Sequence, residues 1–201
     1  MNDSCFSTSA LKAINLKRKD HGSPKVKESP TSAGELQKLM NGYTAKELAS
    51  DKVAMTALLK PKVRPGCTMD IYEYIGASTD NMIMLKTTDL AVNSWYNKKI
   101  YYDFKTGQPK YAKTDDKKMK AFKKAQSDEF TALIWKKSTT TLFGIKGKWA
   151  VVWLCPGGNK PTDTQQTYVD NVSDKCIKDG YNRCYNEMAL KYHNEMRVQH
   201  I

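Results

Sequence analysis

The sequence lacks the features that direct a protein into or across a membrane. Its 201 residues contain no apolar run long enough to span a bilayer. The first ten residues, MNDSCFSTSA, have neither the basic start nor the apolar run of a secretory signal peptide. Asn2 follows Met1, where N-myristoylation requires glycine. We therefore expect a cytoplasmic protein.

Histidine is scarce, because the chain has only His21, His193 and His200. His21 ends a predicted helix and the other two lie close to the C-terminal end. The sequence therefore supports neither a Ser-His-Asp triad nor a Cys-His pair. We expect no catalysis, no bound metal and no other cofactor.

Cysteine is present in an odd number at irregular intervals: Cys5, Cys67, Cys155, Cys176 and Cys184. Cys176 and Cys184 would lie roughly 12 Å apart along a helix, which is beyond disulfide reach. We interpret the five as reduced thiols in a cytosolic protein. The alternative is a secreted protein whose signal peptide is missing from this sequence.

Acidic charge is in short supply, since 33 basic and 21 acidic residues give a formal net charge of +12. Only four of the basic residues are arginines, and their scatter does not favour nucleic-acid binding. Lysines in such density attract an anionic membrane surface or lipid, although a solvated loop that only keeps the protein soluble is the alternative. Met119 and Phe122 among them could enter a lipid interface or pack inward. The densest basic segment spans residues 110–124 and contains Lys110, Lys113, Lys117, Lys118, Lys120, Lys123 and Lys124.

The clearest structural pattern lies at residues 128–159. Phe130, Leu133 and Ile134 share one face at helical spacing, and Asp128 is a candidate cap for that helix. Residues 139–145 and 149–155 are rich in β-branched and aromatic residues. They flank a turn at Gly147, which predicts a β-hairpin. Further helices are predicted at 10–21, 34–50, 51–59 and 87–100, the last with an inward stripe of Val92, Trp95 and Tyr96.

These elements predict one domain at residues 10–165, after a disordered tail at 1–9 and before a polar linker at 166–185. Residues 10–21 (ALKAINLKRKDH) and 189–200 (ALKYHNEMRVQH) match at six positions with an offset of 179. This similarity favours the start of a second copy of the domain at residues 186–201. A C-terminal helix that is similar by chance is the alternative.

Two segments carry a resemblance to a known family, the CAP superfamily of cysteine-rich secretory proteins, venom allergens and plant pathogenesis-related proteins. Residues 129–138, EFTALIWKKS, are similar to its first signature, with Glu129 in place of the leading histidine. Residues 151–159 are similar to the second signature, an apolar strand that ends in P-x-G-N. Phe143 and Trp153 stand at about the positions of cysteines that secreted members carry, so the Golgi-associated, disulfide-free branch resembles this chain most. The resemblance implies an α/β fold, a three-layer α-β-α sandwich with a central antiparallel sheet.

The resemblance also implies a cleft in which two histidines and two glutamates hold a divalent metal. Pro61, Met69 and Lys98 stand at three of these four positions, and only Glu129 could still ligate. If the register shifts, Glu73 takes the place of Met69. The metal site is thus expected to be degenerate.

We therefore expect a non-enzymatic CAP-like protein that engages anionic or sterol-like lipid and protein partners, peripherally at the Golgi or another membrane. A homodimer is a further option. The alternative is a secreted venom allergen-like protein with immunomodulatory or metal-dependent hydrolase activity.

Overall fold

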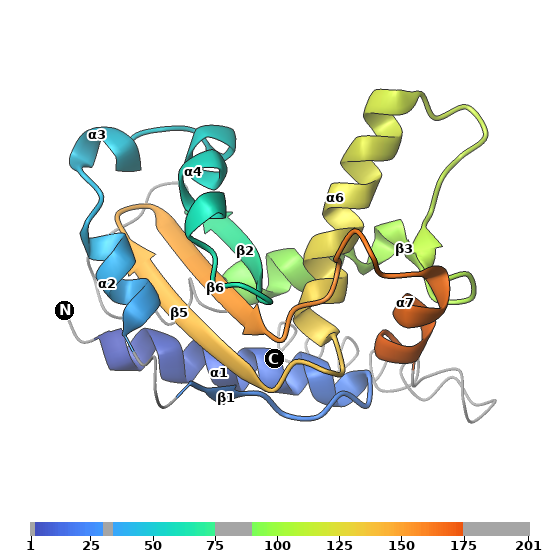
Figure 1. Ribbon diagram of the computed structural model, residues 1–201, viewed down its shortest axis with the longest axis horizontal. Helices are drawn as coiled ribbons and strands as arrows, with labels where there is room; N and C mark the ends of the chain where they lie inside the picture. Colours follow the sequence, from blue (N-terminus) through green and yellow to red (C-terminus); the bar gives the residue numbers. More distant parts are fainter. Residues whose placement is uncertain (1–2, 30–33, 75–89, 175–201) are drawn as a thin grey trace, which may run out of the picture.

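The computed structural model describes residues 3–29, 34–74 and 90–174 of the chain. Figure 1 shows a twisted sheet with helices on both sides of it. The helices are α1 (Asp3–Asp20), α2 (Glu35–Asn41), α3 (Ala45–Leu48), α4 (Lys52–Leu59), a helix at 90–97, α6 (Lys117–Ile134) and α7 (Gln165–Asn171), with short 3-10 helices η1 (Lys60–Lys62) and η2 (Lys98–Tyr101). The strands are β1 (Lys27–Glu28), β2 (Thr68–Glu73), β3 (Tyr102–Asp103), β4 (Gln108–Pro109), β5 (Thr140–Lys146) and β6 (Trp149–Cys155).

The main sheet has the strand order β1-β5-β6-β2. Strands β5 and β6 form the predicted antiparallel hairpin, which turns at Gly147 with a φ of 56°. Strand β2 pairs antiparallel to β6, but β1 pairs parallel to β5. Strands β2, β6 and β5 thus form the expected central antiparallel sheet, and β1 adds a parallel strand at its edge, so the sheet as a whole is mixed. The two residues of β1 carry no alternating pattern that could have indicated a strand.

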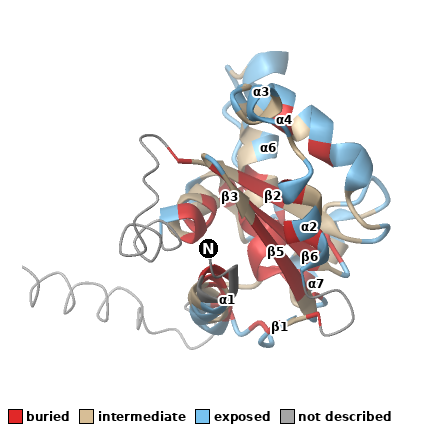
Figure 2. Cartoon of the chain, turned by 90° about the vertical axis from the view of Figure 1, so that its left-hand side faces the viewer, coloured by how far each residue is buried: buried red, intermediate tan, exposed pale blue. Residues whose placement is uncertain are grey.

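Strand β6 lies at the centre of the protein, with both of its faces buried. Ala150, Val152 and Leu154 point into one hydrophobic cluster, which also contains Ile14 of α1 and Leu133 of α6. The alternate residues Trp149, Val151 and Trp153 point into a second cluster with side chains of α2 and α4. Figure 2 shows this buried sheet between its helices. The arrangement confirms the three-layer α-β-α sandwich.

The N-terminal end differs from expectation. Helix α1 begins at Asp3, so residues 3–9 are helical rather than a disordered tail. The physical reason is the spacing of Phe6, Ala10 and Ile14, which recur every four residues and are all buried. The ring of Phe6 meets that of Phe143 edge-on, with 6.3 Å between centroids. Residues 3–9 therefore belong to the folded domain, and Phe6 to its hydrophobic core.

The predicted linker also proved to be partly folded. Helix α7 occupies Gln165–Asn171 and begins with a reciprocal capping box between Thr164 and Thr167. Tyr168 packs edge-on against Trp135 at 5.4 Å, and Val172 is buried in the first cluster. The domain thus extends at least to Asp174, beyond the predicted boundary at 165. Residues 175–201, which include the rest of the predicted linker and the proposed second copy, lie outside the described residues.

The predicted helix at 34–50 is divided in two, because Thr44 caps the start of α3. The helix predicted at 87–100 is observed at 90–97 and continues as η2, while residues 87–89 lie outside the described residues. Val92, Trp95 and Tyr96 are buried as predicted.

A buried arginine joins the end of α1 to the end of α6. The Arg18 guanidinium donates hydrogen bonds to the carbonyls of Pro24, Leu133 and Ser138 at 2.8 to 3.0 Å. The Ser23 hydroxyl donates to the carbonyl of Ile134 at 2.6 Å. Carbonyls at a helix C-terminus lack partners within the helix, so these donors complete the last turn of α6. Burial lowers the pKa of Arg18 to about 10.

Candidate functional site

Helix α6 is a single helix of 18 residues that starts earlier than the sequence indicated. Asp116 is the N-cap, and its carboxylate accepts a hydrogen bond from the Met119 amide at 2.7 Å. Asp128, the predicted cap, lies inside the helix and forms an ion pair with Lys124 at 2.7 Å. Lysine, alanine and glutamine favour helix, which explains why the basic segment extends α6 toward the N-terminus. The same helix therefore carries both the lysine-rich segment and Glu129.

The two signature-like segments contact each other at the inner end of α6. The Asn159 side chain donates to the Asp128 carbonyl at 2.6 Å and accepts from the Thr131 hydroxyl at 2.7 Å. A Cβ atom added to Gly158 would lie 2.2 Å from the Trp135 ring, so only glycine fits there. The residues that suggested the family therefore serve to pack α6 against the end of β6.

Glu129 forms ion pairs with two lysines. Its Oε1 lies 3.1 Å from Nζ of Lys52, the first residue of α4, and its Oε2 contacts Nζ of Lys98 in η2. The side chains of Glu129 and Lys98 are only 17% and 15% exposed, so solvent screens their attraction weakly. Glu129 and Lys98, which the resemblance assigned to one cleft, are thus in contact, and Lys52, which the sequence did not single out, also contacts Glu129. We call Lys52, Asp70, Lys98 and Glu129 the charged cluster.

Asp70 is the buried member of the charged cluster. Burial, and secondly the nearby Glu129 carboxylate, raises the pKa of Asp70 well above its ordinary value. Its Oδ2 is buried without a hydrogen-bond partner among the described residues. Met69, which the resemblance placed in the glutamate position, instead packs with the second cluster on the opposite face of the sheet. Asp70, the next residue along β2, therefore lies on the face of the sheet that Glu129 approaches, and the sequence did not single it out.

The charged cluster does not fit a divalent metal. Both carboxylate oxygens of Glu129 already face ammonium groups, which supply no lone pair and repel a cation. Pro61 lies exposed in η1 and has no side-chain donor atom. Among the described residues, no group of three or more His, Cys, Asp or Glu side chains is arranged to hold a metal ion.

Replacing Asp70 with asparagine should stabilise the protein at neutral pH. The folded-state pKa of Asp70 lies above the unfolded one, so its contribution to stability is complete below about pH 4 and is lost as the pH rises through the folded value. The substitution Asp70→Asn removes the ionisable group and leaves a neutral side chain of similar size. We expect the free energy of unfolding to rise by about 1 kcal/mol or more at pH 7.5 and to change little at pH 4.

Urea unfolding at the two pH values measures this difference. The exposed Asp20→Asn is the control and should shift stability by less than about 0.5 kcal/mol at either pH. A loss of stability in Asp70→Asn at pH 7.5 would contradict the assignment.

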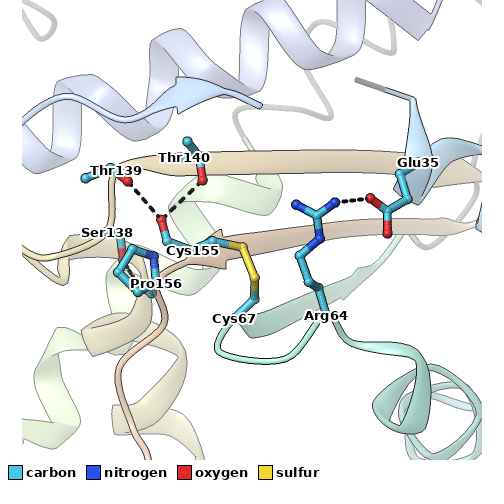
Figure 3. Close-up of a disulfide and its surroundings, with 8 residues drawn as sticks. All are labelled: Glu35, Arg64, Cys67, Ser138, Thr139, Thr140, Cys155 and Pro156. Atoms are coloured by element: carbon cyan, nitrogen blue, oxygen red, sulfur yellow. Dashed lines mark hydrogen bonds and ion pairs between the residues drawn. A yellow bond between two sulfur atoms is a disulfide. The ribbon is translucent and has the colours of Figure 1, made fainter. Parts of the chain in front are cut away.

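A disulfide joins Cys67 to Cys155, so the prediction that these two were reduced thiols was wrong (Figure 3). The pairing of Thr68 with Leu154 in the sheet makes Cys67 and Cys155 the next facing pair, with a Cα–Cα distance of 4.4 Å. Sequence spacing could not reveal this, because the cysteines are 88 residues apart. Cys176 and Cys184 lie outside the described residues.

No helix among the described residues is both long and apolar enough to cross a membrane.

Five of the seven lysines at residues 110–124 lie in the first half of α6, and Lys110 and Lys113 lie in the loop before it. Lys123 pairs with Asp115 and Lys124 with Asp128, both at 2.7 Å. The other five, Lys110, Lys113, Lys117, Lys118 and Lys120, form no ion pair with any described residue. Figure 1 shows the first turns of α6 rising clear of the sheet and its covering helices. We call residues 110–124 the lysine-rich end of α6.

Comparison with known proteins bears on the fold. No family model matches the sequence, and no curated protein was found that matches it. Among solved structures, BmVAL-1 is similar with a TM-score of 0.50 and 17% identity, over 78% of this chain and 81% of that chain. Na-ASP-1 has a TM-score of 0.47 and 13% identity over 86% of this chain, which spans only 44% of that chain. Venom allergen-like protein 4 (SmVAL4) of Schistosoma mansoni has a TM-score of 0.42 and 13% identity, over 80% and 86% of the two chains.

At these identities the comparison speaks to the fold and not to activity or ligand. The likeness to BmVAL-1 agrees with the layers described above, in which helices pack around a mixed four-stranded sheet. This chain has the α/β CAP fold.

Proposed function

We propose that this protein is a non-enzymatic member of the CAP superfamily that binds an anionic lipid surface through the lysine-rich end of α6. The observation that carries the proposal is the combination of unpaired lysines with a helix end that stands clear of the body. A lysine near an anionic membrane contributes about 1 kcal/mol to binding. Three such lysines in the first turns of α6, with Lys110 and Lys113 in the loop before it, are therefore sufficient for adsorption at moderate salt.

Helix electrostatics support the same proposal. Lys117, Lys118 and Lys120 lie in the first turns of α6, where the partial positive charge of the helix N-terminus disfavours cations. The first turn of α6 contains no acidic residue. An anionic surface against this end of α6 would offset the repulsion between the lysines and the helix N-terminus, which is not offset in the isolated protein.

The contacts of Glu129 and of His21 support a non-enzymatic role. Glu129 is held between two ammonium groups and has no free oxygen with which to act as a base or ligand. His21 is buried, with one ring nitrogen 2.8 Å from the Ser173 carbonyl and the other 3.0 Å from the Tyr96 hydroxyl. Its side chain is thus part of the packing between α1 and the helix at 90–97.

The Cys67–Cys155 disulfide favours a different compartment from the one first expected. Disulfides persist in oxidising environments and are rare in the cytosol. We therefore propose the secretory pathway or the outside of the cell as its compartment, as in the venom allergen-like alternative. A lipid-binding role is compatible with either compartment, and a hydrolase role has no support from the charged cluster.

Charge reversal at the lysine-rich end tests the proposed function. The triple variant Lys117→Glu, Lys118→Glu and Lys120→Glu should bind anionic vesicles roughly a hundredfold more weakly than the unaltered protein. Its free energy of unfolding should rise by about 0.3–1 kcal/mol per substitution, because acidic residues are favourable at a helix N-terminus. Vesicle co-sedimentation at two salt concentrations, with calorimetry of the free protein, measures both effects.

The matched control is Lys12→Glu, Lys25→Glu and Lys62→Glu, which makes the same change in net charge at exposed positions elsewhere. It should retain most of the vesicle binding, since only long-range attraction is lost. Binding that is insensitive to salt and equal on neutral and anionic vesicles, or binding that both triple variants weaken alike, would refute the proposal.

A further inference from the structure

Two large apolar side chains stay exposed on the outer half of α6. Met119 is 44% and Phe122 is 48% exposed. The buried residues of this helix all lie in its last eight positions: Ser127, Phe130, Thr131, Ala132, Leu133 and Ile134. The outer half therefore presents apolar surface that the core of the protein does not use.

Met119 and Phe122 lie on the same face of α6, because they are three residues apart. The Phe122 ring packs edge-on against the ring of Tyr101 in η2, with 5.8 Å between the centroids. The Lys110 amide donates to the Tyr101 carbonyl at 2.7 Å, so the lysine-bearing loop adjoins the same spot. Phe122 is thus held in place on a folded support with its outer part uncovered.

Lysines flank this apolar pair on α6. Around the helix, Lys118 lies on one side of the Met119–Phe122 pair and Lys123 on the other. Lys123 also forms an ion pair with Asp115. An apolar centre with a cationic border matches a bilayer, whose surface is anionic and whose interior is apolar. A soluble polyanion would pair with the flanking lysines but leave Met119 and Phe122 exposed to water.

We infer that Met119 and Phe122 insert into the acyl region of an anionic bilayer while the surrounding lysines contact its headgroups. The inference rests on the proposed function and adds the depth of contact to it. Lysine side chains can extend their ammonium groups toward the headgroups while their methylene chains cover apolar surface. The part of the binding that comes from insertion should survive salt that weakens the part due to charge.

Quenching from inside the bilayer tests the insertion. In Phe122→Trp, vesicles of phosphatidylserine and brominated phosphatidylcholine should quench the introduced indole and shift its emission to the blue. The native tryptophans are buried, so they should contribute little to the change. The matched control is Val53→Trp on α4, at a position that is 80% exposed and outside the lysine-rich end. Its indole should be neither quenched nor shifted.

A second pair of measurements separates lipid from soluble polyanion. Phe122→Ser should bind anionic vesicles about tenfold more weakly and bind heparin within about twofold of the unaltered protein. The lysine triple variant should weaken both. No quenching at position 122, or equal losses on vesicles and heparin in Phe122→Ser, would overturn the insertion while leaving the charge-based proposal in place. A triple variant that binds vesicles normally, with the indole at 122 still quenched, would refute the charge-based proposal instead.

Discussion

Replacing Arg18 with leucine should destabilise the protein by about 3–5 kcal/mol, because the buried carbonyls of Leu133 and Ser138 and the part-buried carbonyl of Pro24 lose their donor at once. Two of these carbonyls belong to Leu133 and Ser138, at and just beyond the end of α6. Leucine cannot replace the hydrogen bonds, and the buried site leaves little room for water to do so. Since a domain of this size has a free energy of unfolding of only about 5–15 kcal/mol, the loss should be visible as a large fall in urea midpoint.

Arg64→Leu provides a control of the same chemical change. Arg64 pairs with Glu35 at the surface, where both side chains are partly exposed, and exposed ion pairs contribute little. We expect a change of at most about 1 kcal/mol. Similar losses in the two variants would show that the buried contacts of Arg18 do not have the importance inferred from them.

Removing the disulfide should be the second large effect. Cys67→Ser with Cys155→Ser releases a link between positions 88 residues apart, and closing a loop of that length is worth roughly 4.6 kcal/mol in the chain-entropy model. The measured cost should be about 2–4 kcal/mol, because the denatured chain is not a fully random coil. Chemical denaturation with and without a reductant provides the measurement.

The reductant is also the control. It should destabilise the unaltered protein by about as much as the double substitution does, and it should leave the double variant unchanged. If two thiols are released on reduction and the urea midpoint does not move, the disulfide makes no net contribution to stability.

Local patterns were sufficient to predict the centre of the fold. The apolar run of β6, the turn at Gly147 and the β-branched residues of β5 predicted the hairpin, and its strands are where the sequence placed them. The stripe of Val92, Trp95 and Tyr96 likewise identified a buried helix face. These predictions succeeded because the signal and the structure involve the same short segment.

Other parts of the fold depend on contacts that are distant in sequence. The parallel pairing of β1 with β5 and the facing of Cys67 with Cys155 follow from the assembled sheet, and neither leaves a local pattern. Helix α7 was missed because its polar composition resembles that of a linker, although Thr164 and Thr167 form a capping box. The start of α1 could have been predicted from the spacing of Phe6, Ala10 and Ile14.

The sequence identified only some residues of the charged cluster, because the cluster joins segments that are distant in the chain. Lys98 and Glu129 were identified through the family resemblance, and they meet in the structure. Lys52 comes from a helix start with no motif around it, and no motif singled out Asp70. Whether a strand residue faces one layer or the other can only be decided once the strand has a partner.

Glu129 has a counter-charge that is covalently part of the chain. A carboxylate neutralised by a bound ion depends on the supply of that ion and can be exposed by a chelator. The ammonium groups of Lys52 and Lys98 are part of the polypeptide, so every folded molecule contains the charges that neutralise Glu129. The junction of α4, η2 and α6 therefore needs no bound metal ion to neutralise Glu129.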